Sequence, residues 1–132
     1  MREKPLVLLI DDEEVFLEIA SMKLSSGGLE TLITRNITEA LRKAEDLLPD
    51  LVLSDIYMPP GPNGWELALE LKRNPKTKQL KIAFFSSLRD PWLEIKADRE
   101  KLIAELGAVT FLSKMDDVDV LAERVWQLIK GE

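Results

Sequence analysis

The sequence predicts an α/β fold, a doubly wound parallel sheet of five strands in the order 2-1-3-4-5 with helices on both faces. Short apolar runs alternate five times with longer stretches of helical periodicity, which is the pattern of consecutive βα units. We interpret all five runs as strands buried on both faces, because strands of a parallel sheet are covered by helices above and below.

The expected strands lie at residues 6–10, 30–34, 51–53, 82–85 and 109–112. A helical stretch follows each of them, and such a stretch is the connection that parallel neighbours need. No repeat, low-complexity tract or linker interrupts this order. We therefore expect one domain over residues 1–132.

The first helix is indicated by Val15, Ile19 and Met22, which recur at helical spacing. It is expected to end at Gly27-Gly28, where a left-handed cap carries no steric cost. Prolines and glycines delimit most of the later helices, which are expected at residues 38–48, 64–74, 91–106 and 118–130.

The composition excludes several classes of function. Without cysteine there is no disulfide or thiolate metal site, and without histidine there is no Ser-His-Asp triad and no imidazole ligand. The net charge of −6 argues against binding to nucleic acid. No stretch approaches the roughly 18 apolar residues of a membrane span, and the N-terminus does not fit a signal peptide. We therefore expect a cytoplasmic protein that binds no membrane.

Polar side chains follow four of the expected strands at the point where each strand ends. Asp11 and Asp12 follow the first strand, Asp55 the third, Ser86 the fourth and Lys114 the fifth. In a doubly wound sheet, ligands bind beyond the carboxyl ends of the strands, near the point where strand order reverses. Each residue alone has a simpler explanation, such as a helix cap, a turn or a solvated surface. Their convergence on one edge of the sheet favours a site.

The chemistry of this group follows from its charges. Clustered carboxylates need a counter-charge, and Mg²⁺ accepts carboxylate oxygens together with phosphate oxygens. Asp55 can act as a nucleophile that forms an acyl phosphate, with Lys114 paired to a phosphoryl oxygen and Ser86 donating a hydrogen bond to another. Glu13 and Glu14, which come next after Asp12, are instead expected to serve the N-terminus of the first helix.

Three segments of the chain resemble the signature segments of response-regulator receiver domains. They are residues 7–13, residues 51–59 followed by Asn63-Gly64, and residues 111–114. The resemblance runs in the family's order from about residue 5 to residue 128. It implies a flavodoxin-like (βα)5 sandwich similar to the chemotaxis regulators.

The resemblance also implies a role for each matching residue. Asp55 matches the phosphoacceptor, and Lys114 matches the lysine of the phosphoryl pocket. Asp12 matches the carboxylate that binds Mg²⁺ directly, Asp11 the one that assists through water, and Tyr57 the residue whose backbone carbonyl completes the metal site. Two further residues match the switch of the family, Ser86 as its hydroxyl and Phe111 as its mobile aromatic ring.

The family mechanism implies a phosphohistidine donor on a sensor histidine kinase or a histidine phosphotransfer protein. Because this chain has no histidine, the donor must come from elsewhere. Phosphorylation then biases a two-state equilibrium of the fourth helix, fifth strand and fifth helix. The resemblance implies no enzyme beyond self-catalysed phosphotransfer and slow autodephosphorylation. No output segment follows residue 130, so the expected output is contact with proteins.

The chain departs from the family pattern in several places. The loop of residues 58–64 is about one residue longer and carries three prolines, which can restrict access to Asp55. Met115 replaces the usual proline, and we expect a trans bond between Lys114 and Met115, since a cis bond would cost about 2.5–4 kcal/mol. Residues 88–95 are a surplus that covers the core edge or meets a partner. Trp126 lies off the apolar stripe of the last helix and is a candidate contact in a homodimer or kinase complex.

Two alternatives stay open at this point, and a third is disfavoured. The chain can be the receiver portion of a larger regulator or hybrid kinase, or a receiver that only docks and is not phosphorylated. A phosphohydrolase with an aspartate nucleophile is disfavoured, because such enzymes need a second acid two residues after the nucleophile, where this chain has Tyr57.

Overall fold

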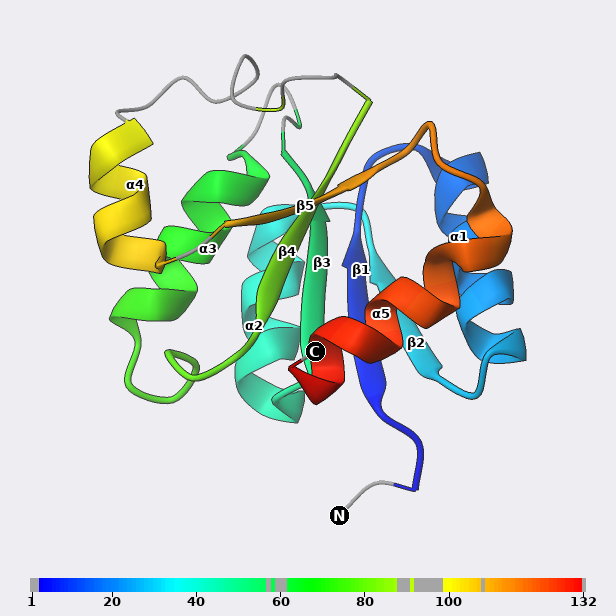
Figure 1. The fold of residues 1–132 in the computed structure, drawn as a ribbon. Helices are drawn as coiled ribbons and strands as arrows, with labels where there is room; N and C mark the ends of the chain where they lie inside the picture. Colours follow the sequence, from blue (N-terminus) through cyan, green and yellow to red (C-terminus); the bar gives the residue numbers. More distant parts are fainter. Residues whose placement is uncertain are drawn as a thin grey trace.

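The computed structural model describes residues 3–56, 58, 62–87, 91, 99–107 and 109–131. Its centre is a five-stranded parallel sheet of order β2-β1-β3-β4-β5, as predicted (Figure 1). The strands are β1 (Leu6–Ile10), β2 (Glu30–Thr34), β3 (Leu51–Asp55), β4 (Ile82–Ser86) and β5 (Thr110–Ser113). Strands β3 to β5 each extend one or two residues beyond their predicted ends, so Asp55 and Ser86 are strand residues and not loop residues.

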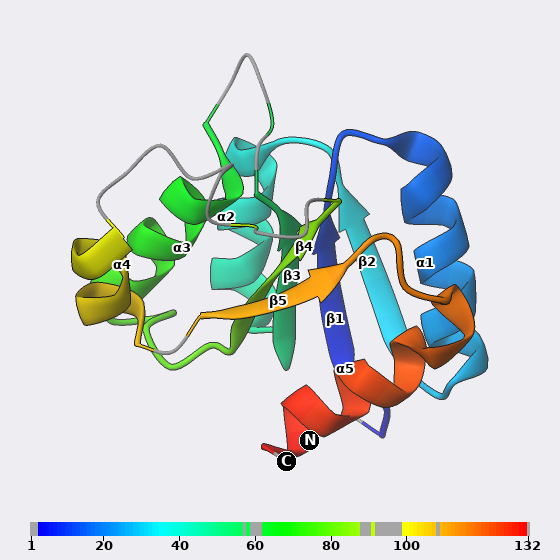
Figure 2. The same cartoon turned by 45° about the horizontal axis from the view of Figure 1, so that its top comes forward.

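Helices cover both faces of the sheet, as Figures 1 and 2 show from two directions. Helices α1 and α5 pack on one face, and α2, α3 and α4 on the other. The helices are α1 (Glu14–Ser26), α2 (Ile37–Leu47), α3 (Gly64–Arg73), α4 (Arg99–Leu106), the 3-10 turn η2 (Val118–Val120) and α5 (Leu121–Lys130). None of the described helices combines the length and the apolar character needed to cross a membrane.

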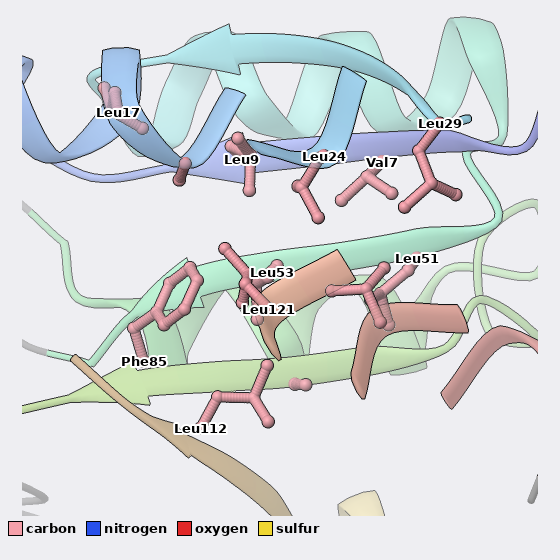
Figure 3. Packing of buried hydrophobic residues seen from close by; sticks show 13 residues of the cluster. Val7, Leu9, Leu17, Leu24, Leu29, Leu51, Leu53, Phe85, Leu112 and Leu121 are labelled. Atoms are coloured by element: carbon pink, nitrogen blue, oxygen red, sulfur yellow. The ribbon is translucent and has the colours of Figure 1, made fainter. Parts of the chain in front are cut away.

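The alternation of side chains along β1 divides the core into two layers. Val7 and Leu9 point toward α1 and α5, where they pack with Leu24 and Leu121 (Figure 3). Leu8 and Ile10 point to the opposite face and pack with residues of α2 and α3. All five side chains of β1 are buried, which is what a central parallel strand requires.

The prediction that all five strands are buried on both faces is wrong for the two outer strands. In β2 only Thr34 is buried, and the Ile33 side chain is 41% exposed. In β5 only Leu112 is buried. Both strands lie at the edges of the sheet, where a helix layer covers the outer side chains only in part.

Helix α1 forms where Val15, Ile19 and Met22 predict it, but these three side chains do not face the core. Val15 is 69% exposed and Met22 is 66% exposed. The buried side chains are instead Leu17, Ala20 and Leu24, which also recur at helical spacing. The helix carries two apolar stripes, and the sheet covers only the second.

The predicted helix boundaries mostly hold to within a residue or two. Helix α1 ends at Ser26. Gly28 follows with a left-handed φ of 89°, which glycine adopts without steric cost. Asn36 caps α2, since its side chain accepts a hydrogen bond from the Glu39 backbone N–H at 2.8 Å. The expected last helix begins as the 3-10 turn η2, and α5 proper starts at Leu121. Of the expected fourth helix the structure describes Pro91 and Arg99–Leu106; residues 92–98 lie outside the described residues.

Trp126 was expected to be an exposed aromatic residue, but its side chain is half-buried; its contact with a partner stays a prediction. The Trp126 side chain is half-buried against the core cluster between α1 and α5. Its indole Nε1–H donates a hydrogen bond to the backbone oxygen of Gly27 at 2.8 Å. The α1–β2 turn comes so close to α5 that a Cβ on Gly27 would lie 2.5 Å from the Ala122 Cβ. Trp126 therefore fastens α5 to the end of α1.

We expect Trp126→Phe to lower the free energy of unfolding by about 1 kcal/mol, because the hydrogen bond to Gly27 is lost while most of the ring packing stays. Urea unfolding followed by circular dichroism measures the change. Wild-type stability in this variant would mean that water replaces the indole donor at no cost.

Candidate functional site

The carboxyl ends of β1, β3, β4 and β5 bring the predicted polar residues to one edge of the sheet. Asp11 comes directly after β1 and Lys114 directly after β5, while Asp55 and Ser86 are the last residues of β3 and β4. The parallel register places Asp55 beside Phe85 and Ser86 beside Ser113, so these strand ends lie level with one another. In Figure 1 this edge is the upper end of the sheet.

Three carboxylates form the acidic part of the site. Asp11, Asp12 and Asp55 each offer an oxygen, and these oxygens lie within 4.8 Å of one another. Asp11 and Asp55 are buried, whereas Asp12 is exposed. Backbone N–H groups orient the two buried side chains, since Asp11 Oδ1 accepts from Glu13 at 3.0 Å and Asp55 Oδ1 accepts from Ile56 at 2.9 Å.

Lys114 is the cation of the site. Its Nζ lies 2.7 Å from Asp11 Oδ2, 3.0 Å from Glu13 Oε1 and 3.5 Å from Asp55 Oδ2. Only 9% of the Lys114 side chain is exposed, and its Nζ also lies 4.8 Å from the centre of the Phe16 ring. One ammonium group thus faces three carboxylates and the face of an aromatic ring.

Burial and the close contacts between charged groups determine the pKa values of Asp11 and Lys114. Burial raises the pKa of the Asp11 carboxyl above its ordinary value, although its hydrogen bonds with Lys114 and the Glu13 backbone act in the opposite direction. Burial alone would lower the pKa of the Lys114 ammonium group, but hydrogen bonding to Asp11 and the charge of Asp55 outweigh it and raise that pKa. Lys114 therefore stays charged.

The donor set of this site fits a small divalent cation. All the side-chain atoms that Asp11, Asp12 and Asp55 offer are carboxylate oxygens, the ligands that Mg²⁺ prefers. Apart from the ion pair with Lys114, no described residue gives the buried Asp11 Oδ2 a hydrogen-bond partner. A hard cation would share this oxygen with Lys114, whose single positive charge already faces three carboxylates.

The two predicted switch residues lie on neighbouring strands. The Ser86 side chain is buried, and the Ser86 backbone oxygen accepts a hydrogen bond from the Lys114 backbone N–H at 2.8 Å. Phe111 is half-buried, with its ring centre 5.9 Å from that of Phe84, and it packs against the cluster that contains Leu102 of α4. Ser86 is thus joined to the residue that follows β5, and Phe111 packs between β4 and α4.

A tight turn holds the end of β3 in place. A Cβ on Gly64 would lie 1.9 Å from the backbone oxygen of Asp55, so only glycine fits at the start of α3. The Gly64 N–H donates to the Ile56 oxygen at 2.9 Å, and the Asn63 side chain accepts from the Met58 N–H at 2.8 Å. Asn63-Gly64 was expected to matter as part of a family signature and as the start of the third helix, not as a tight turn that holds β3. The signal for its local role was Asn63 with Glu66 three residues later, the spacing of a capping box.

Glu13 is the site residue that the sequence analysis missed. It occupies the N-cap position of α1 as expected, but its side chain makes no capping hydrogen bond. It accepts a hydrogen bond from Lys114 Nζ instead. Glu14 lies in the first turn of α1, where an acid complements the helix dipole as predicted.

Several predictions about the loops around the site concern residues that lie outside the described residues. These are the metal-binding carbonyl of Tyr57, the prolines at 59 and 60, and all of the surplus segment 88–95 except Pro91. Met115 is described and is 79% exposed, with its N–H donating to Ser113 Oγ at 3.0 Å. The trans bond between Lys114 and Met115 stays a prediction.

Known proteins that are similar to this chain are response regulators. Residues 7–126 match the response regulator receiver domain family. The phosphate regulon transcriptional regulatory protein PhoB of Pseudomonas aeruginosa is 32% identical over 110 residues, which cover 82% of this chain and 44% of PhoB. The polar-differentiation response regulator DivK of Brucella anthropi is 28% identical over 119 residues, covering 90% of this chain and 91% of DivK. The chain thus spans less than half of PhoB and nearly all of DivK.

Solved structures show the same architecture. A signal receiver domain of a signal transduction histidine kinase from Syntrophus aciditrophicus superposes with a TM-score of 0.77 at 29% identity, covering 96% of this chain and 91% of that one. The chemotaxis response regulator CheY4 of Vibrio cholerae superposes with a TM-score of 0.78 at 22% identity, covering 95% and 98%. The CheY4 likeness concerns the fold alone.

Proposed function

Because the chain belongs to the response regulator receiver family, we propose that it accepts a phosphoryl group on the Asp55 carboxylate and passes the resulting change to protein partners. The observation that carries this proposal is the position of Lys114. Its ammonium group lies within 3.5 Å of Asp55 and 2.7 Å of Asp11, at the edge of the sheet where ligands of this fold bind.

The proposed transfer is a displacement at phosphorus. A carboxylate oxygen of Asp55 forms a bond to the phosphorus of a phosphohistidine, the phosphorus–nitrogen bond breaks, and the imidazole leaves with the electron pair and takes up a proton. The hydrogen bond from the Ile56 N–H orients the Asp55 carboxylate for this attack. The chain has no histidine, so the phosphohistidine lies outside it. We propose a sensor histidine kinase or a histidine phosphotransfer protein as the donor, as the family's mechanism implies.

The described residues supply charge stabilisation for the transferred group. Lys114 pairs with one phosphoryl oxygen, and the Ser86 hydroxyl donates a hydrogen bond to another. Asp11, Asp12 and Asp55, with the backbone carbonyl of Tyr57, would hold Mg²⁺. When bound, the ion neutralises part of the charge that builds up between these carboxylates and the phosphoryl oxygens.

The proposed readout is the face formed by α4, β5 and α5. Movement of Ser86 toward the phosphoryl group opens space that Phe111 can enter, and Phe111 packs on the cluster that includes Leu102 of α4. The output is then contact with another protein or with a second copy of this chain in the cytoplasm. The chain turns over no substrate beyond its own phosphorylation and slow dephosphorylation.

Two settings are compatible with this role. The chain can act as a separate regulator or as the receiver portion of a longer protein. It spans 91% of DivK and 44% of PhoB, and it resembles the receiver of a histidine kinase. Both settings use the same site.

The experiment that tests the proposal is incubation with acetyl phosphate and Mg²⁺, followed by intact-protein mass spectrometry. We expect the mass of one phosphoryl group to be added to the wild type, and no addition to Asp55→Asn or in the presence of a chelator. A folded wild type that gains no mass would contradict the proposal and favour a receiver that only docks.

A further inference from the structure

We propose that Glu13 is a positioning residue of this site, which holds Lys114 in the unphosphorylated chain and competes with the phosphoryl group for its ammonium group. The inference rests on the proposed phosphorylation of Asp55 and adds a determinant of how readily that phosphorylation occurs.

The contact that carries the inference joins two residues far apart in the chain. Lys114 Nζ donates a hydrogen bond to Glu13 Oε1 at 3.0 Å, across 101 positions of sequence. The Glu13 backbone is fixed at both ends, because its N–H donates to Asp11 Oδ1 and its carbonyl oxygen accepts from the Leu17 N–H. The side chain therefore starts from a fixed point beside the site, and it is not used as a helix cap.

The three carboxylates around Lys114 differ in how easily they can release it. Asp11 and Asp55 are buried and short, and their Oδ1 atoms are held by backbone N–H groups. The Glu13 side chain is longer and 63% exposed. A carboxylate that loses its cation in a buried position pays a desolvation penalty, whereas an exposed one returns to water. When a phosphoryl oxygen needs Lys114, Glu13 is the partner that leaves.

The same contact imposes a cost on phosphorylation. An arriving phosphoryl group brings close to two negative charges, and it must displace Glu13 from Lys114 while remaining near the Glu13 charge. Removal of that charge should strengthen binding of a phosphoryl mimic. Because the pair is partly exposed, we expect a gain of about three- to fivefold, the size typical of surface ion pairs.

Glu14 provides a matched control on the next residue. It carries the same charge in the first turn of α1, and in the described structure its ion pair is with Arg35, at 3.8 Å. Glu13→Gln and Glu14→Gln remove equal charge from the N-terminus of the same helix, so any effect through the helix dipole is shared. Only the first removes the competitor for Lys114.

The test measures the affinity of beryllofluoride at saturating Mg²⁺ for the wild type and both variants, by titration of backbone amide resonances. We expect the apparent Kd to fall about three- to fivefold in Glu13→Gln and to stay within about 1.5-fold in Glu14→Gln. The rate of phosphorylation by acetyl phosphate should rise in Glu13→Gln alone.

The outcomes separate the inference from the function on which it rests. If the wild type binds no beryllofluoride, the proposed function fails and this inference fails with it. If the wild type binds but Glu13→Gln matches Glu14→Gln or binds more weakly, Glu13 does not compete for Lys114. If Glu13→Gln is unstable, Glu13→Ala serves as the second variant, because it also removes the Glu13 carboxylate. Glu13 competes for Lys114 only if Glu13→Ala shows the same gain in affinity for beryllofluoride.

Discussion

Replacement of Gly64 by alanine is expected to lower the free energy of unfolding by about 3 kcal/mol, at the upper end for overpacking by a single methyl group. A Cβ at this position would lie 1.9 Å from the Asp55 oxygen and 2.8 Å from Ser54 Oγ. The nearest obstacle is backbone, which has no alternative rotamer. The end of β3 must therefore move, and the Asp55 carboxylate must move with it.

Urea unfolding of Gly64→Ala measures the loss, and phosphorylation by acetyl phosphate shows whether Asp55 has shifted. Gly107→Ala is the comparison variant, because its Cβ would meet nothing within 4 Å although its φ is 80°. That left-handed backbone alone should cost about 1–2 kcal/mol. A Gly64→Ala protein as stable as Gly107→Ala would show that the turn after β3 yields without strain.

Replacement of Lys114 by methionine is expected to lower both the stability and the rate of phosphorylation. Asp11 and Asp55 would lose the cation that lies within 3.5 Å of both, and the buried charge left behind should cost about 3 kcal/mol of stability in the absence of Mg²⁺. Part of that loss should return when Mg²⁺ is added, because the ion supplies the missing positive charge. Phosphorylation should slow on the order of a hundredfold even at saturating Mg²⁺, since a phosphoryl oxygen loses its partner.

Thermal unfolding with and without Mg²⁺, together with phosphorylation rates, checks both parts of this expectation. Lys43→Met is the matched control, because Lys43 forms a surface ion pair with Glu39 and should change stability by less than about 0.5 kcal/mol. An equal response of the two variants to Mg²⁺ would contradict the placement of the metal at Asp11, Asp12 and Asp55.

The strand order and most strand boundaries could be predicted from the sequence, because a parallel sheet leaves a strong periodic pattern. The pattern fails where burial depends on position in the finished sheet. Ile33 is as apolar as any core residue, yet its strand lies at an edge and leaves it 41% exposed. Helix α1 carries two apolar stripes, and sequence alone could not decide that Leu17 and Leu24 face the sheet while Val15 and Met22 do not.

The site was largely predictable for a geometric reason. The carboxyl ends of parallel strands meet at one edge, so residues that follow different strands must meet there too. The structure brings Asp11, Asp12, Asp55, Ser86 and Lys114 to this edge, as expected. The contact between Glu13 and Lys114 could not be foreseen, because it depends on the direction of two long side chains. The packing of Trp126 on the α1–β2 turn depends in the same way on how α5 lies against α1.

The most direct test of phosphorylation at Asp55 locates the phosphoryl group within the chain. Borohydride reduces an aspartyl phosphate to an alcohol, and peptide mass spectrometry then identifies the labelled residue. After treatment with acetyl phosphate and Mg²⁺, we expect a label at Asp55 and at no other carboxylate. A label at Asp11 or Asp12, or a fully folded chain with no label, would contradict this expectation.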